Sequence, residues 1–222
     1  MTTLTDAPLA PLLHRLFAEA QAPASPETRA ALDRVPAARR AALAASATDY
    51  REFYTLAKDS YLAVSRDTAT LLYMLARSSG AREIVEFGCS LGISGLHLAA
   101  ALRDNGGGRL ITTEFEPSKI ERARQNFAAG GLDDLIELRE GDALQTLARD
   151  LPARIDLVLL DGAKPLYPPV LALLEDHLGT GALIVADNAD ASPEYLDRVR
   201  SSEHGYVSVP FAADVELSMR TG

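Results

Sequence analysis

The chain has 222 residues, 47% of them hydrophobic, and a formal net charge of −9. This length suits a single domain over residues 1–222 with a sizeable core. The acidic balance argues against nucleic acid and anionic membranes as partners, because both need a basic surface. The lone cysteine, Cys89, excludes an internal disulfide and indicates a reducing compartment. Without a leader-like start or an apolar run of about 20 residues, we expect a cytoplasmic protein that does not enter a membrane.

Residues 1–77 predict an N-terminal helical layer. Apolar residues recur at helical spacing from Leu9 to Phe17, and Ser25-Pro26-Glu27 is typical of a helix start. A third helix is expected over 39–48. Residues 50–77 predict one long or broken helix, whose interruption at 58–65 fits either a lid over a ligand or an ordinary helix junction. Such a layer would cover the core or a partner subunit, and it suggests a homodimer.

From residue 82 onward, strand and helix patterns alternate. This alternation predicts an α/β fold with a mainly parallel, seven-stranded sheet and helices on both faces. Only Ala212-Ala213-Asp214 joins the last two strands, which is too short for a crossover, so this pair must be antiparallel. The expected strands are 82–87, 109–114, 135–139, 155–160, 182–186, 206–211 and 215–220, and the expected helices are 94–103, 117–129, 142–149, 168–177 and 193–201.

A glycine turn between a strand and a helix dominates the first part of this core. Gly88, Gly92 and Gly95 follow a buried-strand pattern and precede a small, apolar helical run. Backbone can approach a ligand closely where no Cβ intrudes, so this order predicts a nucleotide-type crevice. The spacing differs from the G-x-G-x-x-G of dinucleotide folds, and the acid Glu86 precedes it. An acid disfavours phosphate and favours a cation, which points to S-adenosylmethionine (SAM), a sulfonium without phosphate.

Polar residues also follow the next two strands, where ligands of open parallel sheets bind. Glu114 ends the second strand, and its carboxylate can accept both hydroxyls of a ribose. An acid at this place occurs in NAD folds as well as SAM folds. After the third strand, Gly141-Asp142-Ala143 offers a polar side chain to an adenine edge.

Two further strand ends carry oxygen donors. Asp161 follows the fourth strand, and Asp187 and Asn188 follow the fifth. Asp161-Gly162 and Asp187-Asn188 are each also typical of a turn at a strand end. Together, at neighbouring strand ends, two carboxylates and an amide favour Mg²⁺ or a similar hard cation rather than zinc.

Lys164 lies three residues after Asp161. Next to a bound dication a lysine loses its proton more easily, and could then take the proton of a substrate hydroxyl. An exposed lysine ahead of a helix is the plain alternative. Tyr167 is expected to pack or to form part of the substrate wall, and Glu216 either reaches the substrate end of the crevice or is solvated. Cys89 is expected to be a small buried thiol rather than a nucleophile.

The run from Ile84 to about Gly222 resembles the cation-dependent O-methyltransferases, the group that contains catechol and caffeoyl-CoA O-methyltransferases. The motifs that carry the resemblance are VEFGCSLGISG, LITTEFEPSKIERARQN, GDA, DLVLLDGAKPLY and GALIVADN. The resemblance implies the Rossmann-like methyltransferase fold over 82–222 with an antiparallel last strand, and a cofactor lid at 60–65. The sequence differs from the family pattern at Ala163, where an aromatic residue is common. This difference favours an open acceptor site.

The resemblance also implies roles for single residues. Glu86 and Gly88 would line the methionine end of SAM, with Ser94 near its carboxylate. Glu114 would hold the ribose, Asp142 with Ala143 the adenine, and Asp161 would also belong to the SAM-binding set. Mg²⁺ would be held by Asp161, Asp187 and Asn188, Lys164 would be the general base, and Glu216 would contact a substrate hydroxyl.

The sequence therefore predicts a SAM-dependent and divalent-cation-dependent O-methyltransferase. Its acceptor would be a small hydroxylated molecule, such as a vicinal dihydroxy aromatic or a natural-product intermediate. Three alternatives stay open: a tRNA or rRNA methyltransferase on the same fold, an oxidoreductase that binds NAD, and a non-catalytic SAM-binding protein. The missing G-x-G-x-x-G speaks against the oxidoreductase, and the acidic total speaks against the RNA enzyme.

Overall fold

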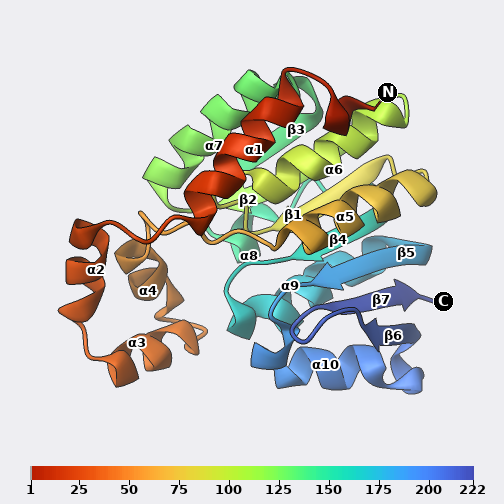
Figure 1. Ribbon diagram of the computed structural model, residues 1–222. Helices are drawn as coiled ribbons and strands as arrows, with labels where there is room; N and C mark the ends of the chain where they lie inside the picture. The colour runs from red at the N-terminus through yellow and green to blue at the C-terminus, as the bar shows by residue number, and fades with distance from the viewer. Residues whose placement is uncertain (1) are drawn as a thin grey trace.

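A seven-stranded sheet forms the centre of the computed structural model, which describes residues 2–222 (Figure 1). Its strand order is β3-β2-β1-β4-β5-β7-β6. All neighbouring strands from β3 to β5 are parallel, and β7 runs antiparallel to both β5 and β6. The predicted fold class and the antiparallel last strand are therefore confirmed. The strands are β1 (Glu83–Phe87), β2 (Arg109–Glu114), β3 (Ile136–Glu140), β4 (Ile155–Leu160), β5 (Leu178–Ala186), β6 (Tyr206–Pro210) and β7 (Glu216–Arg220).

Helices cover both faces of this sheet (Figure 1). The helices α5, α6, α7 and, outside them, α1 lie on one face, while α8, α9 and α10 lie on the other. The helices are α1 (Leu9–Gln21), α2 (Pro26–Asp33), α3 (Ala37–Ala44), α4 (Tyr50–Leu56), α5 (Arg66–Ser78), α6 (Ile93–Asp104), α7 (Pro117–Gly130), α8 (Ala143–Thr146), α9 (Tyr167–Leu174) and α10 (Pro193–Arg200). Within the described residues, no helix combines the length and the apolar character needed to cross a bilayer.

The central strands are apolar on both sides because helices bury both faces. Successive side chains alternate between two cores. Ile84 and Leu157 pack toward α5 and α6, whereas Val85 and Val158 pack toward α8, α9 and α10. All four are at most 1% exposed. This double burial holds the strand ends, and hence the polar residues that follow them, in fixed positions.

The predicted helix over 142–149 is shorter than expected. It ends as α8 at Thr146, and the guanidinium of Arg139 donates hydrogen bonds to the carbonyls of Thr146, Arg149 and Asp150, each at 2.8 Å. Carbonyls at a helix end need partners outside the helix. Arg139 supplies them from β3, so another helical turn is not required.

The N-terminal layer divides into two parts. Helix α1 packs its apolar face on α6 and α7, with Leu12 and Leu16 in the same cluster as Phe127. The helices α2, α3 and α4 instead form a group beside the sheet, at the left of Figure 1. Residues 57–65 are non-helical, so the predicted long helix is broken. Ser65 is the N-cap of α5, and its hydroxyl oxygen accepts a hydrogen bond from the backbone N–H of Thr68 at 3.0 Å.

Candidate functional site

Two adjoining cavities open at the carboxyl ends of the parallel strands. The first, here called the β1–β2 cavity, is lined by the glycine turn and by residues after β1, β2, β3 and β4. The second, here called the lid cavity, has a volume of about 1040 Å³ and lies between α3, α4 and residues 61–65 on one side and the ends of β4 and β5 on the other. Tyr54, Leu62 and Asp161 line both cavities. The crevice predicted at the strand ends is therefore present and has two compartments.

The glycine turn forms the floor of the β1–β2 cavity. Gly88 has a φ of +102°, and a Cβ there would lie 2.6 Å from the carbonyl oxygen of Asp161. Only glycine tolerates both the conformation and the contact. The turn and the end of β4 therefore meet backbone to backbone, which leaves the cavity wall free for a ligand.

Glu86 lies beneath this turn rather than against the cavity. It is 0% exposed, and the hydroxyls of Ser94 and Thr112 donate to its two carboxylate oxygens. Burial raises the pKa of Glu86 to about 7, although both hydrogen bonds act to lower it. Its position on β1 turns the side chain toward α6, so Glu86 does not border the cavity here, and its place at the methionine end of SAM stays a prediction. Ser94 instead borders a small hollow shared with Ser90 and residues 61–63.

Glu114 lines the β1–β2 cavity as predicted. Its carboxylate accepts backbone N–H bonds from Ser90 at 2.9 Å, Phe115 at 2.8 Å and Glu116 at 3.0 Å. Burial raises the pKa of Glu114, while these backbone hydrogen bonds lower it. The carboxylate is thus held in one orientation before any ligand binds.

Asp142 and Ala143 behave differently from each other. Ala143 lines the β1–β2 cavity, whereas the side chain of Asp142 accepts the N–H of Leu144 at 2.9 Å and caps α8. The second oxygen of Asp142 lies 2.7 Å from the guanidinium of Arg51 on α4. The carboxylate of Asp142 therefore attaches α4 to this wall and is not itself part of the lining.

The predicted metal ligands and base come together in the lid cavity, which Asp161, Lys164, Asp187 and Asn188 all line. Burial raises the pKa of both Asp161 and Asp187. The charge of Asp161 raises the pKa of Asp187 further. The Nζ of Lys164 lies 3.1 Å from Oδ1 of Asp161. Among residues 2–222, no three His, Cys, Asp or Glu side chains form a metal cluster, so the available donor set is two carboxylates and one amide.

Tyr167 and Glu216, the two residues considered for the substrate end, lie away from the two cavities. Tyr167 is fully buried, and its hydroxyl lies 2.7 Å from the carbonyl oxygens of both Leu160 and Asp187, so it packs between the ends of β4 and β5. Glu216 is 1% exposed and is bound by Arg200 of α10 at 2.9 and 2.7 Å. Neither is among the residues that line the two cavities. Tyr167 packs, which is one of the two outcomes expected for it, whereas Glu216 is neither solvated nor at the substrate end of the crevice.

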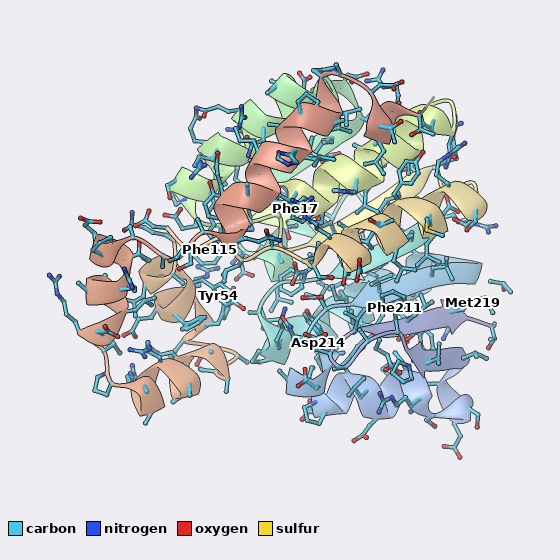
Figure 2. All side chains as sticks on the ribbon, in the orientation of Figure 1. Phe17, Tyr54, Phe115, Phe211, Asp214 and Met219 are labelled. Atoms are coloured by element: carbon cyan, nitrogen blue, oxygen red, sulfur yellow. The ribbon has the colours of Figure 1, made fainter. Side chains whose placement is uncertain are left out.

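Other residues in the site escaped sequence reasoning. Asp214, in the loop before β7, lines the lid cavity and accepts a hydrogen bond from the side-chain amide of Asn188 at 3.1 Å. Tyr54 lies between the α2–α4 group and the sheet, as Figure 2 shows, while Phe211 and Asp214 come from the loop between β6 and β7. Burial raises the pKa of Tyr54 to about 12. The aromatic spacing of Tyr50, Phe53 and Tyr54 was the available signal for α4.

The fold and the two-compartment crevice define a Rossmann-like protein of the SAM-dependent methyltransferase class. The sequence model of the O-methyltransferase family matches residues 42–198, and the chain belongs to this family. The crystal structure of the O-methyltransferase TomG from Streptomyces achromogenes, solved in complex with SAM, superposes with a TM-score of 0.65 at 29% identity. That comparison covers 85% of this chain and 91% of TomG.

Relatives with curated names agree with this family. A catechol O-methyltransferase of Niastella koreensis is 32% identical over 139 residues, which are 61% of this chain and 62% of that protein. A catechol O-methyltransferase of Mycobacterium tuberculosis is 32% identical over 170 residues, covering 76% of this chain and 74% of the relative. The chain thus spans about three fifths of the length of the first relative.

Proposed function

We propose that this chain is a SAM-dependent and divalent-cation-dependent O-methyltransferase, acting on a hydroxyl group of a small vicinal dihydroxy aromatic. The observation that carries the proposal is the position of Asp161, which lines both the β1–β2 cavity and the lid cavity and lies 3.1 Å from Lys164. A methyl transfer needs a donor and an acceptor in adjoining compartments with reacting atoms near each other. The family and the names of the catechol O-methyltransferase relatives support this reading.

SAM, the methyl donor when bound, fits the β1–β2 cavity. The turn at Gly88 gives a wall of backbone that a Cβ would fill. Glu114 presents a fixed carboxylate that suits ribose hydroxyls, and Ala143 offers a small apolar surface for an adenine ring. This lining agrees with the presence of SAM in the related TomG structure.

A divalent ion such as Mg²⁺ fits Asp161, Asp187 and Asn188. Burial and the charge of Asp161 raise the pKa of Asp187, and a bound cation would offset both effects. Oxygen donors of this kind suit a hard cation. When bound, such an ion supplies the positive charge that acidifies an acceptor hydroxyl.

Lys164 would act as the general base. It lines the lid cavity, and Asp161 holds its Nζ at the junction of the two compartments. In its neutral form it would take the proton of the acceptor hydroxyl, leaving an oxygen nucleophile that faces the donor. Tyr54, Leu62 and Phe211 would form apolar walls around the acceptor ring.

The test is methyl transfer from SAM to a panel of catechols and hydroxylated natural products, with Mg²⁺ and with a strong chelator. We expect turnover of at least one dihydroxy aromatic and its loss in chelator. Turnover that is undiminished by chelator would remove the metal from the proposal. SAM binding without transfer to any acceptor would favour a non-catalytic SAM-binding protein instead.

An RNA acceptor is less well supported. Of the described residues that line the lid cavity, four are aspartates, namely Asp67, Asp161, Asp187 and Asp214, and one is a cation, Lys164. Phosphate groups would be repelled there. Methylation of bulk tRNA or rRNA under conditions that leave catechols unmodified would overturn this preference.

Two further expectations remain proposals. A cytoplasmic location is supported by the lone buried thiol of Cys89, which needs no oxidising compartment.

A homodimer is supported more by the edge strand β6 than by α2 and α3. On this strand Val207 is 60% and Val209 53% exposed, beside Met219 of β7. Light scattering coupled to size exclusion would measure the mass in solution, and a monomer at micromolar concentration would contradict the dimer.

A further inference from the structure

A further hollow lies in the outer helical layer, between α1, α5 and α6. This hollow, here called the α1–α5 hollow, has a volume of about 430 Å³, and the residues that line it include Leu13, Phe17, Arg66 and His97. Among the described residues, none that lines it also lines the β1–β2 cavity or the lid cavity. A ligand bound in this hollow would therefore lie apart from the donor and the acceptor.

His97 presents an unpartnered polar atom to the α1–α5 hollow. The residue is only 4% exposed, and its Nδ1 lies 2.8 Å from the carbonyl oxygen of Ile93, so Nδ1 carries the proton and donates. Within residues 2–222, the other ring nitrogen, Nε2, has no hydrogen-bond partner, yet the fully enclosed side-chain polar atoms without a partner are those of Thr146 and Tyr195. Nε2 of His97 is therefore not enclosed and reaches the hollow, where its lone pair can accept a hydrogen bond. Burial and the charge of Arg66 lower the pKa of His97 to about 4, which keeps the ring neutral.

Arg66 supplies a positive charge in the wall of the same hollow. Its guanidinium lies 4.2 Å from the ring centroid of Phe17, in a cation–π contact. Across the described part of the chain, this guanidinium takes part in no ion pair within 4.0 Å and no hydrogen bond, and the hydroxyl of Thr70 donates to the backbone carbonyl of Arg66. The neighbouring acid, Asp67, lines the lid cavity instead. The planar fork of an arginine suits a carboxylate, so Arg66 is free to bind one.

The charge of the α1–α5 hollow is opposite to that of the whole chain. The chain has a net charge of −9, yet the titratable side chains that line the hollow, within residues 2–222, are those of Arg66, His14 and His97. Leu13 and Phe17, which are 6% and 4% exposed, add an apolar wall. A ligand that matches this lining has a flat apolar body, an anionic group and a hydrogen-bond donor.

We propose that the α1–α5 hollow is a second ligand site, and that it binds a small aromatic carboxylate that also bears a hydroxyl group. The carboxylate would pair with Arg66, the ring would lie against Leu13 and Phe17, and the hydroxyl would donate to Nε2 of His97. Arg66 is the first residue of α5 and directly follows the non-helical residues 57–65. The ligand would thus join α1 to the two helices that begin at the crevice. The site does not depend on the proposed function, because it uses none of the residues of the two cavities.

The experiment titrates the full chain, without metal, with 2-, 3- and 4-hydroxybenzoate, benzoate, phenol and inorganic phosphate by calorimetry. At least one hydroxybenzoate should bind threefold or more tightly than benzoate, which lacks the hydroxyl, and tenfold or more tightly than phenol, which lacks the carboxylate, or phosphate, which lacks the ring. Arg66→Met should lower the affinity for that hydroxybenzoate at least tenfold. Arg15→Met is the matched control, because it removes an exposed cation of α1 that pairs with Glu19 and does not line the hollow, so it should change the affinity less than twofold.

Nitrogen-15 NMR of the histidine rings locates the ligand in the wild-type protein. The chain has four histidines. When the hydroxybenzoate binds, the assigned Nε2 signal of His97 should move upfield, as the signal of an imidazole nitrogen does when it accepts a hydrogen bond. The signals of His177 and His204, which do not line the hollow, should stay in place.

Four results would overturn the proposed site. They are no binding of any hydroxybenzoate, affinities for benzoate or phosphate that equal those of the hydroxybenzoates, an undiminished affinity in Arg66→Met, and an unmoved Nε2 signal of His97 with the ligand bound. The comparison of ligands and the NMR measurement need no variant. Absence of SAM binding or of methyl transfer would remove the proposed function and leave this site unaffected, so the two proposals fail separately.

Discussion

The β1–β2 cavity and the lid cavity share Asp161 but are built by different parts of the chain. Strand ends and the turns that follow them form most of the first, with Tyr50, Tyr54 and Leu62 added from outside, and a sheet buried on both faces fixes the positions of the strand ends. The second is closed by α3, α4, residues 61–65 and the loop before β7, which lie outside the parallel core. The donor side is thus mostly a property of the parallel core, while the acceptor side depends more on added segments. Changes on the two sides should accordingly separate donor binding from acceptor use.

The largest effect is expected where the two cavities meet. Lys164→Ala should lower kcat by at least 100-fold, because general base catalysis typically contributes that much, while the affinity for SAM stays within twofold. Steady-state kinetics with a catechol and calorimetry with SAM would measure the two quantities. Asp161→Ala should affect both, since Asp161 lines both cavities. A Lys164→Ala variant with full turnover would show that the proton leaves by another route.

The metal prediction separates the cavities in a second way. Asp187 lines the lid cavity but not the β1–β2 cavity. Asp187→Asn should raise the Mg²⁺ concentration needed for half-maximal turnover by at least tenfold, because one of two carboxylate ligands is lost. The affinity for SAM, measured without metal, should be unchanged. Equal Mg²⁺ requirements in variant and wild type would exclude Asp187 as a ligand.

Glu86 gives a prediction that concerns stability on the donor side. Its pKa is about 7 in the folded protein, against 4.5 for an unperturbed glutamate. The folded state therefore binds the proton more tightly, so this group stabilises the fold fully below pH 4.5. That contribution is lost as the pH rises through 7, and amounts to about 3 kcal/mol.

The variant Glu86→Gln, which cannot titrate, tests this sign. Between pH 5 and 7.5, the free energy of unfolding of the ligand-free wild type should decline relative to that of the variant. Urea unfolding at both pH values would measure the difference between the two proteins, in which the titration of other buried acids cancels. A wild type that gains stability over the variant as the pH rises would contradict a raised pKa.

The division between the ends of the parallel strands and the added segments also explains which positions the sequence predicts well. Asp161, Asp187 and Asn188 each follow a strand whose apolar pattern is unmistakable, so the order of strands alone places them at one rim of the sheet. The glycine turn at Gly88 is equally clear, because only glycine permits its φ and its contact with β4. For these residues, local pattern and tertiary position agree.

Other positions depend on information that the local pattern does not contain. Glu86 and Glu216 lie on strands, and which face each acid takes depends on the register and on partners far away in the chain, such as Arg200 for Glu216. Lys119 looks like any lysine on an amphipathic helix until α7 is packed against the turn at Ser90. The path of α2–α4 over the lid cavity similarly follows from tertiary contacts of Tyr50 and Tyr54, which helical periodicity alone does not reveal.

The smallest expected effect concerns α4, a segment that contributes to both cavities. Helix α4 supplies Tyr50 and Tyr54 to the β1–β2 cavity and Phe53 and Tyr54 to the lid cavity. Its ion pair from Arg51 to Asp142, at 2.7 Å, is half exposed on the arginine side, so it should contribute no more than about 1 kcal/mol. Arg51→Met should therefore leave kcat unchanged and raise KM for donor and acceptor together, by no more than about fivefold.

The control for this variant is Arg103→Met, which breaks the ion pair of Arg103 with Asp134 at the far end of α6. Arg103 lines neither cavity, so both KM values should match the wild type. If Arg51→Met raises KM for the donor alone, α4 belongs to the donor side and the lid cavity is held by other contacts. If it raises KM for both donor and acceptor, α4 supports both compartments, as Asp161 does. Donor binding and acceptor binding then cannot be separated by changes in that helix.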